Sequence, residues 1–131
     1  MIEFAIVVVL LIMLLYGIIT YGLILAAKAT VTQAAADAAR AGLVMSSSAV
    51  STAETQAGTD VGWMGKGACS TSNTIITCVA SKEKCPSNAS IECLSVTVTY
   101  NYSSSPLFPE LPGLGVITPS TISSTNIVQL G

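Results

Sequence analysis

The sequence predicts an α+β fold in which a long N-terminal α-helix carries a small, disulfide-stapled antiparallel β head. Two observations lead to this prediction. Residues Phe4–Ala27 contain no charge and no proline, and a helix-forming composition continues beyond them without a break. The C-terminal part holds all the cysteines, together with segments in which β-branched and aromatic residues alternate with polar ones.

The first predicted element is one continuous helix over residues 2–45. Its uncharged run, Phe4–Ala27, would be about 36 Å long, which is enough to cross a bilayer with some tilt. An alanine-rich amphipathic stretch follows, in which Val31, Ala38 and Gly42 share one face. The whole helix would be about 65 Å long, roughly twice what a bilayer requires.

Two glycines, Gly17 and Gly22, interrupt the apolar run. They allow two interpretations, which the residues leave equally open. Small residues permit close packing of membrane helices, whereas a glycine pair also makes a soft spot where a helix bends once it leaves lipid.

The chain is predicted to divide at Ser46–Ser48 into the helix, residues 1–45, and an extracytoplasmic head, residues 46–131. The head should begin with a second helix over residues 49–62.

A capping box formed by Ser51 and Glu54 is predicted to start this second helix. Trp63 and Met64 follow it, and we expect both to pack the helix onto the head, in preference to a ligand-stacking role for Trp63.

The rest of the head reads as strands and loops. Residues 73–81 and 121–130 are predicted strands, and residues 94–102 show the clearest alternation, so this strand should pair antiparallel with the last one. Residues 82–90 and the proline-rich residues 103–119 are predicted loops.

The cysteines predict two disulfides and hence an oxidising compartment, with four free thiols as the alternative. No CxxC pair occurs, which argues against a zinc or redox motif. Sequential pairing is preferred among three connectivities. The preferred pairs are Cys69 with Cys78 and Cys85 with Cys93.

Composition argues against several functions. The chain has no histidine, so neither imidazole ligation of a metal nor histidine acid–base catalysis is available. A net charge of −2 argues against contact with nucleic acid. The carboxylates are scattered and no glycine-rich phosphate loop occurs. We therefore expect no enzyme, no catalytic residue, no metal and no cofactor.

Charge and cysteines conflict on topology. Lys28 and Arg40 follow the apolar run and no basic residue precedes it, which by the positive-inside rule places the head in the cytoplasm. Disulfides place it outside. A basic leader removed from in front of Met1 would resolve the conflict. Outside the cytoplasm, Asn88 and Asn101 would be candidate glycosylation acceptors, because each begins an Asn-x-Ser triplet, although such triplets are common by chance.

The N-terminal part contains three motifs: I-E-F-A-I-V-V-V-L-L, G-I-I-T-Y-G and A-A-A-D-A-A-R-A-G. The C-terminal part adds V-T-V-T-Y-N-Y, followed by a loop rich in proline and leucine. Together they resemble the TadE-like pilins of the tight-adherence, type IVc pilus systems. The resemblance implies a pilin-like stalk. It also implies that a prepilin peptidase removes a basic leader, and that an ATPase-driven platform moves the subunit from the cytoplasmic membrane into a filament at the cell surface.

The resemblance also implies an assembly role for Glu3, the acid near the mature N-terminus. A buried carboxylate is costly unless it is paired, and the α-amino group of Met1 in an adjacent subunit would be a natural partner. The alternative is an interfacial glutamate stabilised by the helix N-terminus. Two departures stand out: the family's glutamate is usually fifth, and many relatives carry an acid where this chain has Thr20.

The sequence thus predicts a structural pilin subunit that polymerises through its N-terminal helix and serves adhesion or a related surface function. The alternative is a non-polymerising, single-pass membrane-anchored extracytoplasmic binding protein, which the same apolar run would support.

Overall fold

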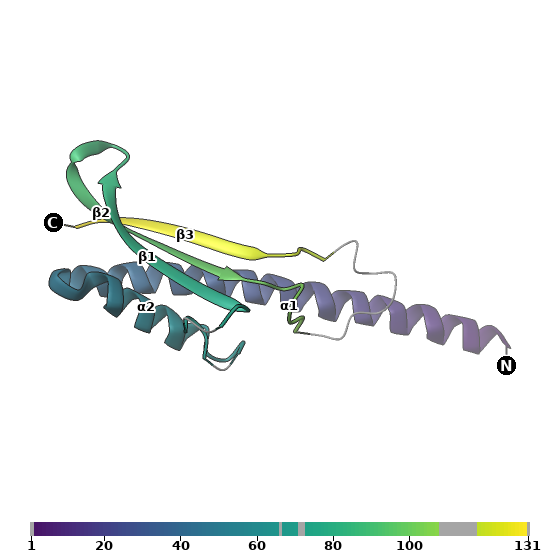
Figure 1. The fold of residues 1–131 in the computed structure, drawn as a ribbon. Helices are drawn as coiled ribbons and strands as arrows, with labels where there is room; N and C mark the ends of the chain where they lie inside the picture. The colour runs from purple at the N-terminus through teal and green to yellow at the C-terminus, as the bar shows by residue number, and fades with distance from the viewer. Residues whose placement is uncertain (1, 66, 71–72, 108–117, 131) are drawn as a thin grey trace.

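The structure, a computed structural model, describes residues 2–65, 67–70, 73–107 and 118–130. A long helix runs the length of the molecule, and a three-stranded sheet and a second helix lie along its C-terminal half (Figure 1). The elements are α1 (Ile2–Val44), a 3₁₀ turn η1 (Ser46–Ser48), α2 (Ala49–Asp60), β1 (Ile76–Cys85), β2 (Asn88–Tyr100) and β3 (Ile122–Gln129). The predicted α+β class, with its long helix and stapled antiparallel head, is confirmed.

The C-terminal half of α1 is part of the hydrophobic core. Its inward face consists of alanines and one valine at helical spacing, and all of them are fully buried. They are Ala27, Val31, Ala34, Ala35, Ala38 and Ala39. The opposite face is polar and exposed, with an ion pair of 3.8 Å between Arg40 and Asp37. The predicted amphipathic stretch therefore packs as its periodicity indicates.

Small residues also let α2 lie close to α1. The chain reverses at η1, and α2 turns back to present Ala49, Ala53 and Ala57 as its buried residues. Gly42 lies at this crossing, where a Cβ would come within 2.3 Å of the Leu94 side chain and 3.0 Å of the Ala49 carbonyl oxygen. The helices can approach this closely because Gly42 has no side chain.

Replacing Gly42 with alanine should therefore lower the free energy of unfolding by about 1–2 kcal/mol, since overpacking outweighs the gain in helix propensity. Urea denaturation of the full chain in detergent micelles, followed by circular dichroism, measures this. Gly22→Ala is the matched control, because nothing lies within 4 Å of that position. Equal stability of the two variants would contradict the close packing at Gly42.

The sheet has the order β1-β2-β3, and both pairings are antiparallel. Alternation along β2 buries Leu94, Val96, Val98 and Tyr100 against the helices, while the residues between them face outward. The pairing of β3 with β2 confirms the predicted C-terminal strand, and a hydrogen bond of 2.9 Å joins the Thr97 and Thr125 hydroxyls across it.

Two local predictions about α2 are wrong. Ser51 and Glu54 form no capping box, because α2 begins at Ala49 and the Ser51 hydroxyl donates to the Ser48 carbonyl at 3.1 Å. Trp63 does not pack onto the head; its side chain is 59% exposed, whereas Met64 beside it is buried. The turn after α2 thus carries only the second of these two side chains inward.

The predicted loop over residues 82–90 is also wrong. β1 runs through Lys82–Lys84 to Cys85, and β2 begins at Asn88, so the two strands form a hairpin with a register shift near its end. Lys82 is held by a hydrogen bond of 3.1 Å from its Nζ to the Ser46 carbonyl oxygen. The predicted proline-rich loop is irregular over residues 103–107, and residues 108–117 lie outside the described residues.

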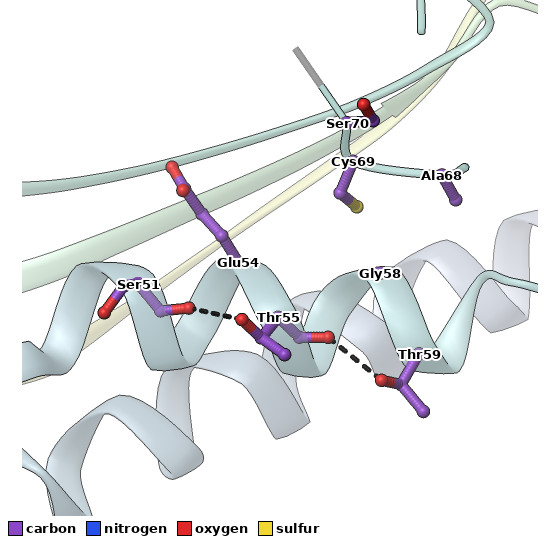
Figure 2. A pocket seen from close by; sticks show the side chains of 8 residues that line it. All are labelled: Ser51, Glu54, Thr55, Gly58, Thr59, Ala68, Cys69 and Ser70. Atoms are coloured by element: carbon purple, nitrogen blue, oxygen red, sulfur yellow. Dashed lines mark hydrogen bonds between the residues drawn. The ribbon is translucent and has the colours of Figure 1, made fainter. Parts of the chain in front are cut away.

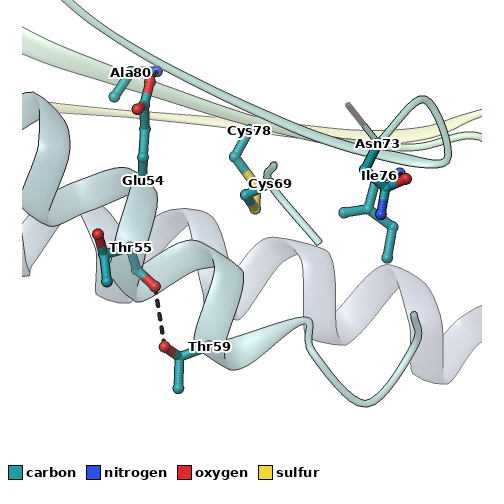
Figure 3. The surroundings of a disulfide bond; sticks show 8 residues. All are labelled: Glu54, Thr55, Thr59, Cys69, Asn73, Ile76, Cys78 and Ala80. Atoms are coloured by element: carbon teal, nitrogen blue, oxygen red, sulfur yellow. Dashed lines mark hydrogen bonds between the residues drawn. A yellow bond between two sulfur atoms is a disulfide. The ribbon is translucent and has the colours of Figure 1, made fainter. Parts of the chain in front are cut away.

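Disulfides link Cys69 to Cys78 and Cys85 to Cys93, with Cα–Cα distances of 4.8 and 5.0 Å. The first ties the turn after α2 to β1 (Figure 3). The second closes the hairpin, since both cysteines lie near its end. In so small a head, each bridge would contribute about 2–4 kcal/mol.

Tyr100 lies fully inside the core, with its hydroxyl donating to the Ser105 carbonyl and its ring edge-on to Tyr102. Burial, with a smaller effect from Tyr102, raises the pKa of Tyr100 above its ordinary value of about 10. As pH rises past that value, the unfolded chain releases the proton while the folded chain keeps it. Stability should therefore fall with rising pH.

Tyr100→Phe should flatten this alkaline loss of stability, because the side chain then has no proton to release. Urea midpoints measured at pH 8, 9, 10 and 11 test the expectation. Tyr21→Phe is the control, since the Tyr21 side chain is exposed. The expectation fails if Tyr100→Phe and wild type lose stability in parallel.

Candidate assembly surface

The N-terminal half of α1 projects beyond the head (Figure 1) and exposes a continuous apolar surface. Every large hydrophobic residue named on it is about half exposed or more, from Phe4 at 75% to Leu25 at 50%. Among the described residues, α1 is the one helix long and apolar enough to cross a membrane, by length and composition. Soluble proteins rarely leave such a surface in water, so it marks a contact with lipid or protein.

One polar group within this surface, the Thr20 hydroxyl, is satisfied by the helix itself. The Thr20 hydroxyl donates to the Tyr16 carbonyl oxygen at 2.9 Å, which satisfies a donor that lipid would leave without a partner. Gly17 and Gly22 lie inside the unbroken helix, and neither has atoms within 4 Å of a built Cβ. Their open surroundings leave room for a neighbouring helix at both positions.

Glu3 lies in the first turn of α1, at the end of the apolar surface farthest from the head. Its side chain is exposed, and an acid in the first turn is favoured by the helix dipole. Met1, its predicted partner in assembly, lies outside the described residues. The predicted pair joins the Glu3 carboxylate of one chain to the α-amino group of Met1 in an adjacent chain, and it stays a prediction.

A groove of about 440 Å³ lies on the head between α2 and the segment Ala68–Ser70 (Figure 2). Glu54 is the one acid that lines it, and its Oε1 accepts a hydrogen bond of 3.4 Å from the Ala80 N–H on β1 (Figure 3). Gly58 allows the close approach, since a Cβ there would lie 3.1 Å from the Ala68 carbonyl oxygen. Glu54 therefore covers the open edge of β1, a role that the sequence pattern did not reveal.

Across the described residues, no group of three or more His, Cys, Asp or Glu side chains is placed to hold a metal ion. The two triplet asparagines lie apart: Asn88 is exposed at the start of β2, while Asn101 is half-buried and accepts a hydrogen bond of 2.9 Å from the Ser103 hydroxyl.

The comparisons with known proteins bear on the apolar helix. The model of the family described as "TadE-like protein" matches residues 1–40. This N-terminal segment is TadE-like. The match covers the apolar surface and much of the alanine face that enters the core, and it ends before the head. No curated protein and no solved structure matched the chain.

The TadE-like match confirms the resemblance of the three N-terminal motifs and does not reach the C-terminal V-T-V-T-Y-N-Y. Over this segment the chain is similar to TadE-like proteins, a likeness that suggests an association with a pilus and that does not extend to the head. The apolar N-terminal helix is compatible with both membrane anchoring and surface display.

Proposed function

We propose that this TadE-like chain is a structural pilin that polymerises through α1 into an extracellular type IV-like filament for adhesion or a related surface function. One observation carries the proposal: the two halves of α1 have different surroundings. One face of α1 from Ala27 to Ala39 is built into the core of the head, whereas most of the large apolar residues before Ile24 are about half exposed or more.

This division supports two successive environments for one helix. The head holds α1 rigidly, so the exposed half projects as a fixed rod about 35 Å long. Lipid would surround the rod before assembly. In a filament, the same rods would pack side by side, with the heads outside and Gly17 and Gly22 at helix contacts. The large apolar area would suit an obligate assembly.

The division of the chain into residues 1–45 and 46–131 accordingly separates a filament core from an exterior. The proposed partners are further copies of the chain, and a prepilin peptidase and an assembly platform before polymerisation. The TadE-like match over residues 1–40 supports these partners as members of the same pilus system.

Shearing cells that express the chain, and sedimenting the released material, tests the proposal. We expect filaments that contain this chain, and helical reconstruction from electron micrographs should place α1 in the filament core with the sheet outside. If the chain stays wholly in the membrane fraction of cells whose pilus machinery is intact, it is a membrane-anchored protein that does not polymerise.

A further inference from the structure

A cavity of about 380 Å³ opens where the apolar half of α1 meets the head. One wall belongs to α1 and includes Tyr21, Leu25 and Lys28. The other wall belongs to the chain entering β3 and includes Thr121 and Ser123. The cavity is therefore formed by segments about a hundred residues apart in sequence. It lies where the uncharged run Phe4–Ala27 ends.

The α1 wall changes from apolar to cationic along the helix axis. Tyr21, Leu25 and Lys28 are spaced by four and three residues, so they follow one face over about 10 Å. Tyr21 is 64% exposed and Leu25 is 50% exposed, so both offer free surface to a ligand. The apolar end lies toward the N-terminus, and the ammonium group lies at the end nearest the head.

This direction matches the depth profile of a bilayer. Lys28 is the first charged residue after Phe4–Ala27, and that run would be about 36 Å long against a hydrocarbon core of roughly 30 Å. Lys28 would then lie among the lipid headgroups, and Tyr21 would lie near the boundary with the acyl chains, where tyrosine is enriched.

The Lys28 ammonium group has no protein counter-ion among the described residues. Of the described residues that line the cavity, none is acidic. A second hollow of about 410 Å³ shares Leu25 and Lys28, and it adds only neutral side chains, including Thr32 and Gln33. The nearest acid along the described helix, Asp37, pairs with Arg40. The exposed hydroxyls of Thr121 and Ser123 add donors to the same cavity.

We propose that this cavity binds one anionic phospholipid of the leaflet on the head side while the chain is in the membrane. The phosphate would be held by Lys28 and by the hydroxyls of Thr121 and Ser123, and an acyl chain would lie along Tyr21 and Leu25. A free phosphate would use only the polar half of the cavity, which is why the occupant is a lipid. The inference rests on the membrane stage of the proposed function, but not on polymerisation.

Native mass spectrometry of the full chain, released from detergent micelles with added phosphatidylglycerol, tests the proposal. We expect one lipid retained per chain, with phosphatidylcholine retained about tenfold less because its choline brings a positive charge near Lys28. Lys28→Gln should weaken retention of phosphatidylglycerol by about tenfold. Lys84→Gln is the matched control, since Lys84 is an exposed cation on β1.

A second variant separates a built site from general attraction between charges. Thr121→Val removes a hydroxyl without altering charge, and it should weaken retention by about threefold. Equal retention by wild type, Lys28→Gln and Thr121→Val would overturn the proposal, as would displacement of the lipid by glycerol 3-phosphate, which has the phosphate but no acyl chain.

Cosedimentation with phosphatidylglycerol vesicles distinguishes the failure of this inference from the failure of the proposed function. A chain that does not enter the vesicles refutes the membrane stage and the lipid site together. A chain that enters them and retains no lipid on release refutes the lipid site alone. Filament formation by sheared cells is scored separately, and its outcome leaves the lipid measurement unchanged.

Discussion

Replacing Leu94 with alanine should lower the free energy of unfolding of the head by about 3–5 kcal/mol. Leu94 is fully buried on the inner face of β2, and its Cδ2 lies only 2.3 Å from where a Cβ on Gly42 would be. It therefore fills the space that α1, α2 and the sheet enclose. Alanine would leave a cavity there, because the alanine-rich helices have no large side chain to move into it.

Urea denaturation of the full chain in detergent micelles, followed by circular dichroism, measures this loss. Ile127→Ala is the matched control, since Ile127 is 48% exposed on β3, and this change should cost less than about 1 kcal/mol. Equal losses in the two variants would refute the role of Leu94. The Gly42→Ala change should also cost less when Leu94 is already alanine, because the residue that it clashes with is gone.

The elements that the sequence predicted well are those whose partners are implied by periodicity. The spacing of the alanines in α1 and the alternation in β2 each predict which side of the element is buried. Neither prediction depends on which residues lie opposite. β3 was predicted as an uncharged Ser/Thr strand with β2 as its antiparallel neighbour. The TadE-like motifs were also recognisable, because residues 2–40 of the matched segment belong to α1 alone.

The features that the sequence missed depend on contacts between distant residues. Residues 82–90 were predicted to form a loop because of Pro86, Ser87 and Asn88. Lys82–Lys84 nevertheless continue β1, because Lys82 reaches the Ser46 carbonyl and the Cys85–Cys93 bridge closes the hairpin. Glu54 read as part of a helix cap, but it accepts a hydrogen bond from Ala80, 26 residues away. No local pattern contains these pairings.

The same reason explains why the cavity beside Lys28 was absent from the sequence prediction. In the sequence, Lys28 marked the end of the apolar run and, with Arg40, its basic flank. Its place in the cavity depends on the chain that enters β3. This segment packs beside α1, so that Thr121 and Ser123 line the same cavity as Lys28.

Replacing Glu3 with glutamine should reduce the yield of sheared filaments by at least about tenfold, because burial of an α-amino group without its carboxylate partner costs several kcal/mol. Glutamine keeps the length and the hydrogen-bonding oxygen of Glu3 and removes only the charge. The Glu3 side chain is exposed, so its replacement should not disturb the core of the head. Immunoblots of the sheared and membrane fractions measure filament yield and membrane insertion together.

The two interpretations of Glu3 differ in where the loss should appear. If Glu3 pairs with the α-amino group of an adjacent subunit, insertion is normal in Glu3→Gln and polymerisation fails, since the pair exists only between chains. If Glu3 only stabilises the helix N-terminus at the bilayer edge, filament yield is unchanged, because the dipole effect is worth about 0.3–1 kcal/mol at an exposed site. Glu92→Gln, an exposed acid on β2, removes the same charge from the head and should leave both fractions unchanged.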